Sequence, residues 1–280
     1  MSKNWSITML EYTMIEEFPN AWLYAGQYVY EGASPITYTI CLLKKGDELV
    51  LIDTGYDMEK PDARDFAIAQ KHLKYQSPVK VLKKAGVDPA DIKHVILTHA
   101  HWDHMGGLNF FPNAKFYIQK EEILKWVETM ALPHEYGVIK HPILKGDMED
   151  CIRLMSEDRV VLLDGAVDDL LEGIDIRVAR YGHSWASNVV LIHTEKGIFA
   201  NCGDVAYVRK NITGGEDDGA ALPNGFGVGG AYDTIRAIQD IKGWVGGDVD
   251  KILLAHEMGV FDLYESEVTD DDLHIAYVVR

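Results

Sequence analysis

The most informative stretch of the sequence is Leu97-Thr98-His99-Ala100-His101-Trp102-Asp103-His104-Met105-Gly106-Gly107. It begins at the end of a short apolar run that is typical of a buried strand. Because His99 and His101 are two residues apart in extended chain, their imidazoles point to the same side. Asp103 and His104 follow as the chain turns toward a helix, so this one loop offers four metal ligands. Imidazole and carboxylate together suit Zn²⁺, and Fe, Mn or Co would also be accepted.

Runs of strand length surround this loop. Residues 36–43 and 49–53 are separated by a polar stretch with a turn-forming glycine, which predicts a hairpin. Further strands are predicted at 95–97, 116–118, 160–163, 174–180, 188–193, 197–201 and 252–254. Helices are predicted within 61–85 and at 121–130 and 233–245. Two stretches have no regular period, 131–148 and 211–230.

The order of these elements predicts an α/β protein. Strands are followed by helices in both halves of the chain, and the four short strands between residues 160 and 201 imply a second sheet. Two mixed β-sheets packed face to face, with helices on the outer faces, form an αββα sandwich. We expect residues 1–280 to be a single domain with an irregular insertion at about 131–150.

The charge balance narrows the choice of partners. The chain has 44 acidic and 27 basic residues and a formal net charge of -17, which disfavours nucleic acid and anionic membrane surfaces as partners. No apolar run has signal-peptide character or approaches the roughly 18 residues of a membrane span, so we expect a cytoplasmic protein. Cys41, Cys151 and Cys202 lack metal or disulfide spacing and are predicted to be buried, reduced thiols.

Three further candidate ligands each follow a predicted strand. His183 comes after 174–180, Asp204 after 197–201, and His256 after 252–254. Any one of them alone would more often be a structural residue. Because a His or Asp follows a predicted strand three times, we expect these side chains to complete a metal centre with the 99–104 loop.

The motif set His-x-His-x-Asp-His, Gly-His, Gly-Asp and a late His, in that order, resembles the metallo-β-lactamase-fold hydrolases. The resemblance extends from Leu51-Ile52-Asp53-Thr54-Gly55 to His256. Within that superfamily the chain looks most similar to the N-acyl homoserine lactonases, since Tyr207 stands three residues after Asp204 as it does in those enzymes. Many lactonases of this fold carry Pro-Gly-His after the Gly-His element, whereas this chain has Ser184-Trp185-Ala186-Ser187.

The resemblance implies a dinuclear metal site. The implied ligands are His99, His101 and His183 for one divalent ion, Asp103, His104 and His256 for the other, and Asp204 as a bridge. Asp53 would orient a ligating imidazole, although Asp53-Thr54-Gly55 also fits an ordinary turn at the end of a strand.

Two ions about 3.5 to 4 Å apart can share a hydroxide and so provide a nucleophile. No Gly-x-Ser-x-Gly sequence supplies a serine nucleophile instead. The expected reaction is the opening of a lactone such as an N-acyl homoserine lactone, with Asp103 or Asp204 carrying the proton to the leaving oxygen. Tyr207 either helps to hold the oxyanion or is a packed aromatic.

Several alternatives stay open at this level. The small-molecule substrate could be another cyclic ester, an amide or a thioester, and the chain could also be a metal-binding scaffold with a decayed site. The oligomeric state is open, a homodimer included. Candidate pocket residues, each with packing or solvent exposure as the alternative, are Tyr28, Tyr30, Phe110, Phe111, Trp126, Trp185, His134 and His141.

Overall fold

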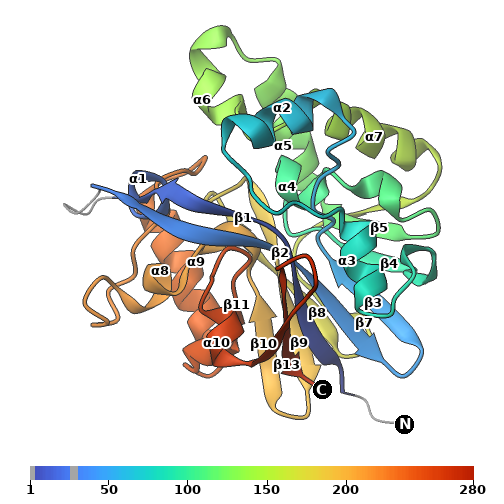
Figure 1. Ribbon diagram of the computed structural model, residues 1–280. Coiled ribbons are helices and arrows are strands. Elements are labelled where there is room, and N and C mark those ends of the chain that lie inside the picture. The colour runs from blue at the N-terminus through green and yellow to red at the C-terminus, as the bar shows by residue number, and fades with distance from the viewer. Residues whose placement is uncertain (1–3, 26–30) are drawn as a thin grey trace.

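Two β-sheets face each other at the centre of the protein in the computed structural model, which describes residues 4–25 and 31–280 (Figure 1). Within the described residues the first sheet has eight strands in the order β12-β13-β1-β2-β3-β4-β5-β6. Their bounds are β1 (Ser6–Pro19), β2 (Ala33–Lys45), β3 (Glu48–Ile52), β4 (His94–Ile96), β5 (Lys115–Gln119), β6 (Val160–Leu163), β12 (Glu265–Val268) and β13 (His274–Val279).

In the same described part of the chain, the second sheet has five strands in the order β11-β10-β9-β8-β7. Their bounds are β7 (Val167–Leu171), β8 (Ile174–Arg180), β9 (Ala186–Thr194), β10 (Gly197–Asn201) and β11 (Ile252–Leu253). Both sheets are mixed, because β3 to β6 pair in parallel in the first sheet and β10 pairs in parallel with β11 in the second. This is the αββα sandwich that the sequence predicts.

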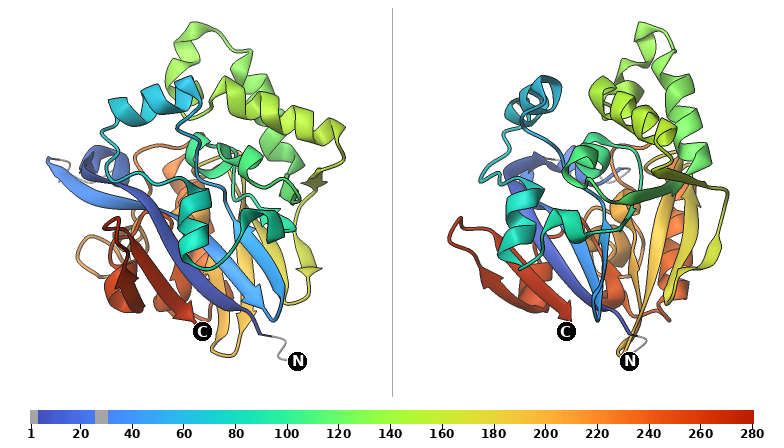
Figure 2. Two further views of the ribbon diagram at one scale, coloured as in Figure 1. Left: turned by 45° about the vertical axis from the view of Figure 1, so that its right-hand side comes forward. Right: turned by 90° about the vertical axis from the view of Figure 1, so that its right-hand side faces the viewer.

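Helices cover the outer faces of the sandwich and one end of it. They are α1 (Asn20–Leu23), α2 (Pro61–Ala69), α3 (Pro78–Lys84), α4 (Trp102–Met105), α5 (Lys120–Met130), α6 (Gly137–Lys140), α7 (Lys145–Ser156), α8 (Arg209–Thr213), α9 (Ala231–Trp244) and α10 (Val260–Leu263). Single 3₁₀ turns lie at η1 (Pro89–Asp91), η2 (Leu108–Phe110), η3 (His134–Tyr136), η4 (Gly203–Val205) and η5 (Val249–Lys251). Figures 1 and 2 show α2, α5, α6 and α7 at the end that carries α4, with the C-terminus at the opposite end.

The period of two in the strands explains the layers. On β1, Ile7 and Met9 face the second sheet and join a core with Ile176 and Val190, whereas Leu10 and Tyr12 face the helices. Side chains that alternate between two apolar environments are expected of a sheet covered on both sides. The second sheet is covered in turn by Ile238 of α9 and its neighbours.

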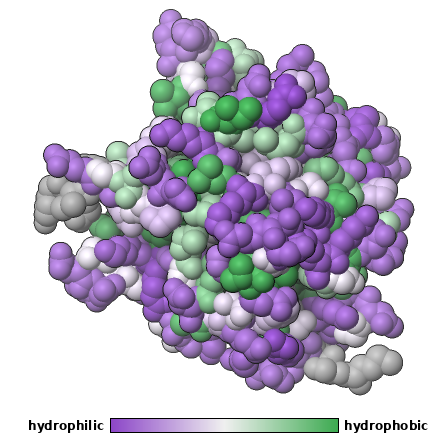
Figure 3. All heavy atoms as spheres, viewed as in Figure 1, coloured by the Kyte–Doolittle hydropathy of each residue, from purple (hydrophilic) through white to green (hydrophobic). Residues whose placement is uncertain are grey.

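The molecular surface is mostly polar on the face shown in Figure 3, where hydrophobic residues form small separate groups. Among the described residues, no helix combines the length and the hydrophobicity needed to cross a bilayer. Cys41, Cys151 and Cys202 are free and buried, as the sequence predicts.

The sequence prediction of the elements was wrong in one place. Strand 160–163 was expected in the second sheet, but as β6 it pairs with β5 in the first sheet, and the unpredicted β7 takes the outer place in the second. The helices predicted within 61–85 are α2 and α3, which are separate because the Ser77 hydroxyl caps a new helix that begins at Pro78.

Other segments differ in detail from the prediction. The long strand β1 and the hairpin β12–β13 were not predicted, although both lie in the first sheet. The stretch 131–148, expected to be irregular, contains η3, α6 and the start of α7.

Candidate metal centre

The loop after β4 places its side chains at one edge of the first sheet. His101 is in extended conformation directly before α4, and Asp103 and His104 lie within that single helical turn. All four predicted ligands of the loop are buried. A loop that buries so many polar side chains must satisfy them locally or through a bound ion.

The second sheet brings its three candidates to the same place. His183 follows β8, Asp204 lies in η4 after β10, and His256 follows β11. The strands β8, β10 and β11 run in the same direction, because β9 is antiparallel to both β8 and β10 while β11 is parallel to β10. Their carboxyl ends therefore meet at one edge. This explains why each of the three candidates follows the end of a strand in the sequence.

The seven predicted ligands form two groups whose donor atoms lie within 4.8 Å of one another. The histidine-rich group is defined as His99, His101, His183 and Asp204, and the carboxylate-rich group as Asp103, His104, Asp204 and His256. Every member is buried. The structure thus brings together all the residues that the resemblance implies as metal ligands.

Asp204 belongs to both groups, and its two oxygens lie among the imidazoles of both. Its Oδ2 lies 3.3 Å from Nε2 of His183, 3.9 Å from Nε2 of His99 and 3.3 Å from Nε2 of His256. Its Oδ1 lies 3.2 Å from Nε2 of His104 and 3.1 Å from Nε2 of His256. A carboxylate between two sets of imidazoles is the geometry that a bridging ligand needs.

Several donor atoms in the centre lack a hydrogen-bond partner within the described part of the chain. They are the Nε2 atoms of His99, His101 and His104 and the Oδ1 atom of Asp204. Buried polar atoms without partners are costly, and a cation supplies what these lone pairs lack. The donor set of imidazoles and carboxylates therefore fits divalent metal ions.

The two groups hold their protons differently. Burial, together with the neighbouring imidazoles, lowers the pKa of His99 well below its usual value. Burial also lowers the pKa of His183, to about 4. In the carboxylate-rich group burial again opposes protonation, but Asp204 and Asp103 together raise the pKa of His104 well above its usual value. Burial likewise opposes protonation of His256, and Asp204 raises its pKa.

Asp53 supports the carboxylate-rich group from behind. Its Oδ2 lies 2.8 Å from Nδ1 of His104, and its Oδ1 accepts a 2.7 Å hydrogen bond from the Thr98 backbone N–H. The residue has a φ of 64°, which costs energy for a residue other than glycine and is held by these contacts. Asp53 thus fixes the His104 ring as well as the turn that follows β3.

Glu122, which has no role in the sequence prediction, supports the histidine-rich group. This carboxylate of α5 is 0% exposed and accepts four hydrogen bonds. Two donors lie beside the ligands, the Ala100 N–H at 3.0 Å and the Ser184 hydroxyl at 2.5 Å. The others are the Ala186 N–H and the Trp126 indole N–H, both at 2.8 Å. Glu122 therefore joins the loop of His99 and His101 to the loop of His183, where the expected Pro-Gly-His sequence is missing.

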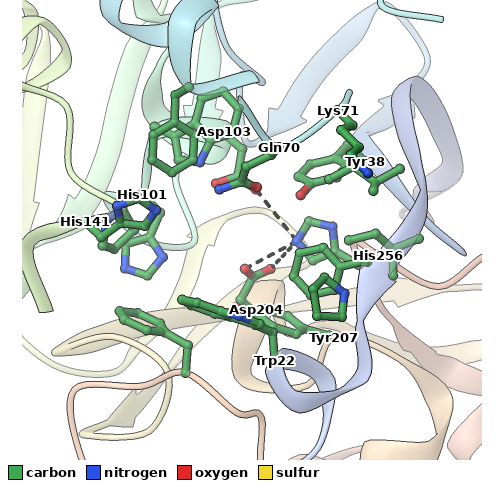
Figure 4. Close-up of a pocket in the computed structure, with 18 of the residues that line it drawn as sticks. Trp22, Tyr38, Gln70, Lys71, His101, Asp103, His141, Asp204, Tyr207 and His256 are labelled. Carbon is green, nitrogen blue, oxygen red and sulfur yellow. Dashed lines mark hydrogen bonds and ion pairs between the residues drawn. The ribbon is translucent and has the colours of Figure 1, made fainter. Parts of the chain in front are cut away.

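A cavity of about 390 Å³ opens onto the centre (Figure 4). Its floor includes His101, Asp103, Asp204 and His256. Its mainly apolar walls are formed by Ile15, Phe18, Pro19, Trp22, Ile36, Tyr38, Phe66, Trp102, Tyr207 and Phe226. Polar side chains, among them Glu17, Gln70, Lys71 and His141, complete the lining.

Most of the predicted pocket residues lie elsewhere. Phe110, Phe111, Trp126 and Trp185 pack in or against the apolar core below the helices. His134 is exposed and does not line the cavity, whereas His141 does. Tyr28 and Tyr30 lie outside the described residues.

The glycine-rich loop between α8 and α9 forms one wall. Phe226 in this loop lies 5.9 Å from the His101 ring and 5.8 Å from the His183 ring, and it stacks on Trp22. A Cβ on Gly227 would lie 2.6 Å from the Gly182 carbonyl oxygen, so only glycine allows this backbone contact. The loop is thereby seated over the histidine-rich group.

Comparison with known proteins agrees with this geometry. The family model described as the metallo-beta-lactamase superfamily matches residues 37–256. An N-acyl homoserine lactonase of Bacillus thuringiensis is 31% identical over 216 residues, which cover 71% of this chain and 74% of that protein.

Two solved structures share the fold. A quorum-quenching N-acyl homoserine lactone lactonase superposes with a TM-score of 0.69 at 19% identity, covering 93% of this chain and 95% of that one. A probable metal-dependent hydrolase from Staphylococcus aureus has a TM-score of 0.70 at 17% identity, covering 100% and 99%. Because the family model covers most of the chain and every candidate ligand, the chain belongs to the metallo-beta-lactamase superfamily and is a metal-dependent hydrolase.

Proposed function

We propose that the protein is a dinuclear lactonase that opens a small, mostly apolar lactone such as an N-acyl homoserine lactone. The observation that carries the proposal is the shared Asp204 of the two donor groups, which lies on the floor of an apolar cavity. The Bacillus thuringiensis relative, an N-acyl homoserine lactonase, supports the choice of substrate class.

In this proposal the histidine-rich group holds one divalent ion and the carboxylate-rich group holds the other, with Zn²⁺ the first choice and Fe, Mn or Co as alternatives. Ions bound there would supply Lewis acidity toward an ester carbonyl and a hydroxide nucleophile at neutral pH. Asp53 and Glu122 would keep the imidazoles in position for those ions, since partners behind the ligands tune both geometry and affinity.

Asp103 and Asp204 are the two carboxylates that could carry a proton during the proposed reaction. Burial opposes the charge on Asp103, but the nearby His104 and His256 lower its pKa, so it is ionised and can accept a proton. Its Oδ2 lies 3.7 Å from Nε2 of His256, and the residue also lines the cavity. Asp103, with Asp204 as the alternative, would therefore pass a proton from the attacking water to the leaving oxygen.

In this proposal Tyr207 would hold the substrate carbonyl oxygen. Its hydroxyl lies 3.4 Å from Nδ1 of His183, and the side chain lines the cavity. Burial raises the pKa of the phenol well above its usual value, so Tyr207 keeps its proton and acts as a hydrogen-bond donor. Such a donor stabilises the negative charge that develops on the oxygen during attack.

The cavity walls favour an acyl chain over a polar substituent. Phe18, Trp22 and Phe226 contribute aromatic surface, and Ile15 and Ile36 contribute aliphatic surface. Each buried CH₂ of an acyl chain contributes about 0.8 kcal/mol. A lactone that carries a chain of several carbons should therefore bind better than the bare ring.

A panel of lactones tests the proposal. Protein reconstituted separately with Zn²⁺, Mn²⁺ or Fe²⁺ is assayed by acid release at constant pH against γ-lactones with and without acyl chains, a thioester and a cyclic amide. We expect lactone opening that chelator abolishes and that increases with chain length. Turnover of the thioester or the amide without any lactone would replace the lactonase proposal by that activity. If no metal bound at all, the protein would be a scaffold with a decayed site.

A further inference from the structure

A second tyrosine besides Tyr207 faces the centre. Tyr38, on the central strand β2, lines the cavity, and Figure 4 shows its hydroxyl directed into it beside Asp103 and His256. Both tyrosine rings pack against His256, at 4.5 Å for Tyr38 and 5.2 Å for Tyr207. The Tyr207 hydroxyl reaches Nδ1 of His183 in the histidine-rich group, so the hydroxyls of the two tyrosines serve different parts of the centre.

The Tyr38 ring is held firmly. It is only 5% exposed, and its centroid lies 4.5 Å from the His256 ring and 4.5 Å from the His72 ring. Tyr12 packs on it edge to face at 6.3 Å. The position of the hydroxyl is therefore fixed before any substrate arrives, which is the condition for an effective electrostatic contact.

The hydroxyl itself has no hydrogen bond to any residue in the described ranges 4–25 and 31–280. Neighbouring tyrosines of the same cluster differ in this respect. Tyr12 donates to the Asp103 backbone carbonyl at 2.9 Å, and Tyr75 donates to the Tyr56 backbone carbonyl at 2.8 Å. A phenol that packs its ring in protein and leaves its hydroxyl free in a cavity is available to a ligand.

The Tyr38 hydroxyl is a hydrogen-bond donor at neutral pH, because an ordinary phenol keeps its proton there. It lies on the side of the cavity where Asp103 would deliver a proton.

We propose that Tyr38 is a catalytic residue that donates a hydrogen bond to the leaving alkoxide oxygen of the substrate. This inference rests on the proposed ester-opening reaction. In that reaction the oxygen of water bonds to the acyl carbon, the bond from that carbon to the alkoxy oxygen breaks, and the water proton passes through Asp103 to the departing oxygen. Tyr38 keeps its own proton and stabilises the charge on that oxygen until the proton arrives. Tyr207 serves the carbonyl oxygen instead.

The test uses the basicity of the leaving group. A γ-lactone and an acyclic alkyl ester leave as basic alkoxides, whereas a 4-nitrophenyl ester leaves as a stabilised phenolate that needs little help. We expect Tyr38→Phe to lower kcat for the lactone and the alkyl ester by about 100-fold and to leave the aryl ester within about threefold. Tyr207→Phe should lower kcat for the lactone, the alkyl ester and the aryl ester alike, because every one of these substrates has the carbonyl.

Two controls separate this role from a structural one. Tyr75→Phe makes the same chemical change in the same aromatic cluster outside the cavity, and it should show no dependence on the leaving group. Metal content and melting temperature of Tyr38→Phe should equal those of the unmodified protein. Equal losses for alkyl and aryl substrates, or no loss for either, would overturn the proposal. If the unmodified protein hydrolyses the esters but no lactone, the lactonase proposal fails, while the comparison of alkyl and aryl esters still tests Tyr38.

Discussion

The two donor groups of the centre share a carboxylate and are equally buried, yet they treat protons in opposite ways. In the histidine-rich group the imidazoles mainly face one another, and burial holds the pKa values of His99 and His183 below their usual range. In the carboxylate-rich group His104 and His256 face carboxylates, which raise their pKa values. The neighbours of a buried imidazole thus set the direction of its pKa shift, and an ion that entered the carboxylate-rich group would compete with protons more than one that entered the histidine-rich group.

Removal of the shared ligand should have the largest effect. Asp204→Ala takes an oxygen from both groups and leaves buried imidazoles without their counter-charge, so we expect loss of both ions and a fall in kcat/KM on the order of 1000-fold or more. Elemental analysis after dialysis and ester hydrolysis measure the two losses. Asp164→Ala, at an exposed aspartate, should change neither. Full metal content in Asp204→Ala would show that the two groups do not depend on this residue.

Acid should empty the two groups in a fixed order. Metal and proton compete for the same nitrogen lone pairs, and imidazoles with raised pKa values take up protons first as the pH falls. We expect the carboxylate-rich group to lose its ion at a higher pH than the histidine-rich group, where the pKa of His183 is about 4. Metal content measured in steps from pH 8 to pH 4 should fall in two stages. In His256→Ala the stage at higher pH should be absent. A single stage in the unmodified protein would show that the two groups do not differ in their sensitivity to acid.

Glu122→Gln should weaken the histidine-rich group selectively. A glutamine amide cannot accept hydrogen bonds at both ends, so the contact with either the His99–His101 loop or the His183 loop is lost. We expect about 10- to 100-fold weaker binding of one ion, measured by chelator competition, with the other ion unaffected. Glu121→Gln is the matched control. Glu121 is the partly exposed neighbour of Glu122 in the chain, and its carboxylate pairs with Arg180 and Tyr181. Equal weakening of both ions would disprove a selective role.

Asp53→Asn should weaken the carboxylate-rich group by a smaller factor. The amide can still accept one hydrogen bond, and the Thr98 hydroxyl lies 3.4 Å from Nδ1 of His104, so the ring keeps part of its support. We expect about 10-fold weaker binding of one ion, at the low end of such effects. The same chelator competition should show that Asp53→Asn and Glu122→Gln affect different ions. If both variants weakened the binding of the same ion, the assignment of Asp53 to one group and Glu122 to the other would be wrong.

The residues of the two donor groups could be picked out from the sequence because their signal is local. Each ligand follows a strand, and the carboxyl ends of like-directed strands meet at one edge. The sheet assignment of 160–163 failed because a short apolar run has no feature that names its partner strand. The prediction of the cavity walls failed for a similar reason, since Phe18, Trp22 and Phe226 reach the centre from segments far apart in the chain.

Glu122 could have been found from the pattern of α5. Its buried face carries Glu122, Ile123, Trp126 and Thr129, so an acidic residue stands in the apolar stripe of an amphipathic helix. A charge in that position requires hydrogen-bond partners, and such partners are often close to a functional site. Which partners they are depends on two distant loops, and no periodicity in the sequence contains that information.

The position of Asp204 has a consequence for the fold as a whole. Its ligand partners come from both sheets, His99 and His104 from the first and His183 and His256 from the second. An ion held by such a set is a cross-link between the two halves of the sandwich. Its binding energy therefore adds to the free energy of unfolding, by about 1.4 kcal/mol for each tenfold excess of free ion over the Kd. The resistance of this protein to heat should depend on the supply of metal around it.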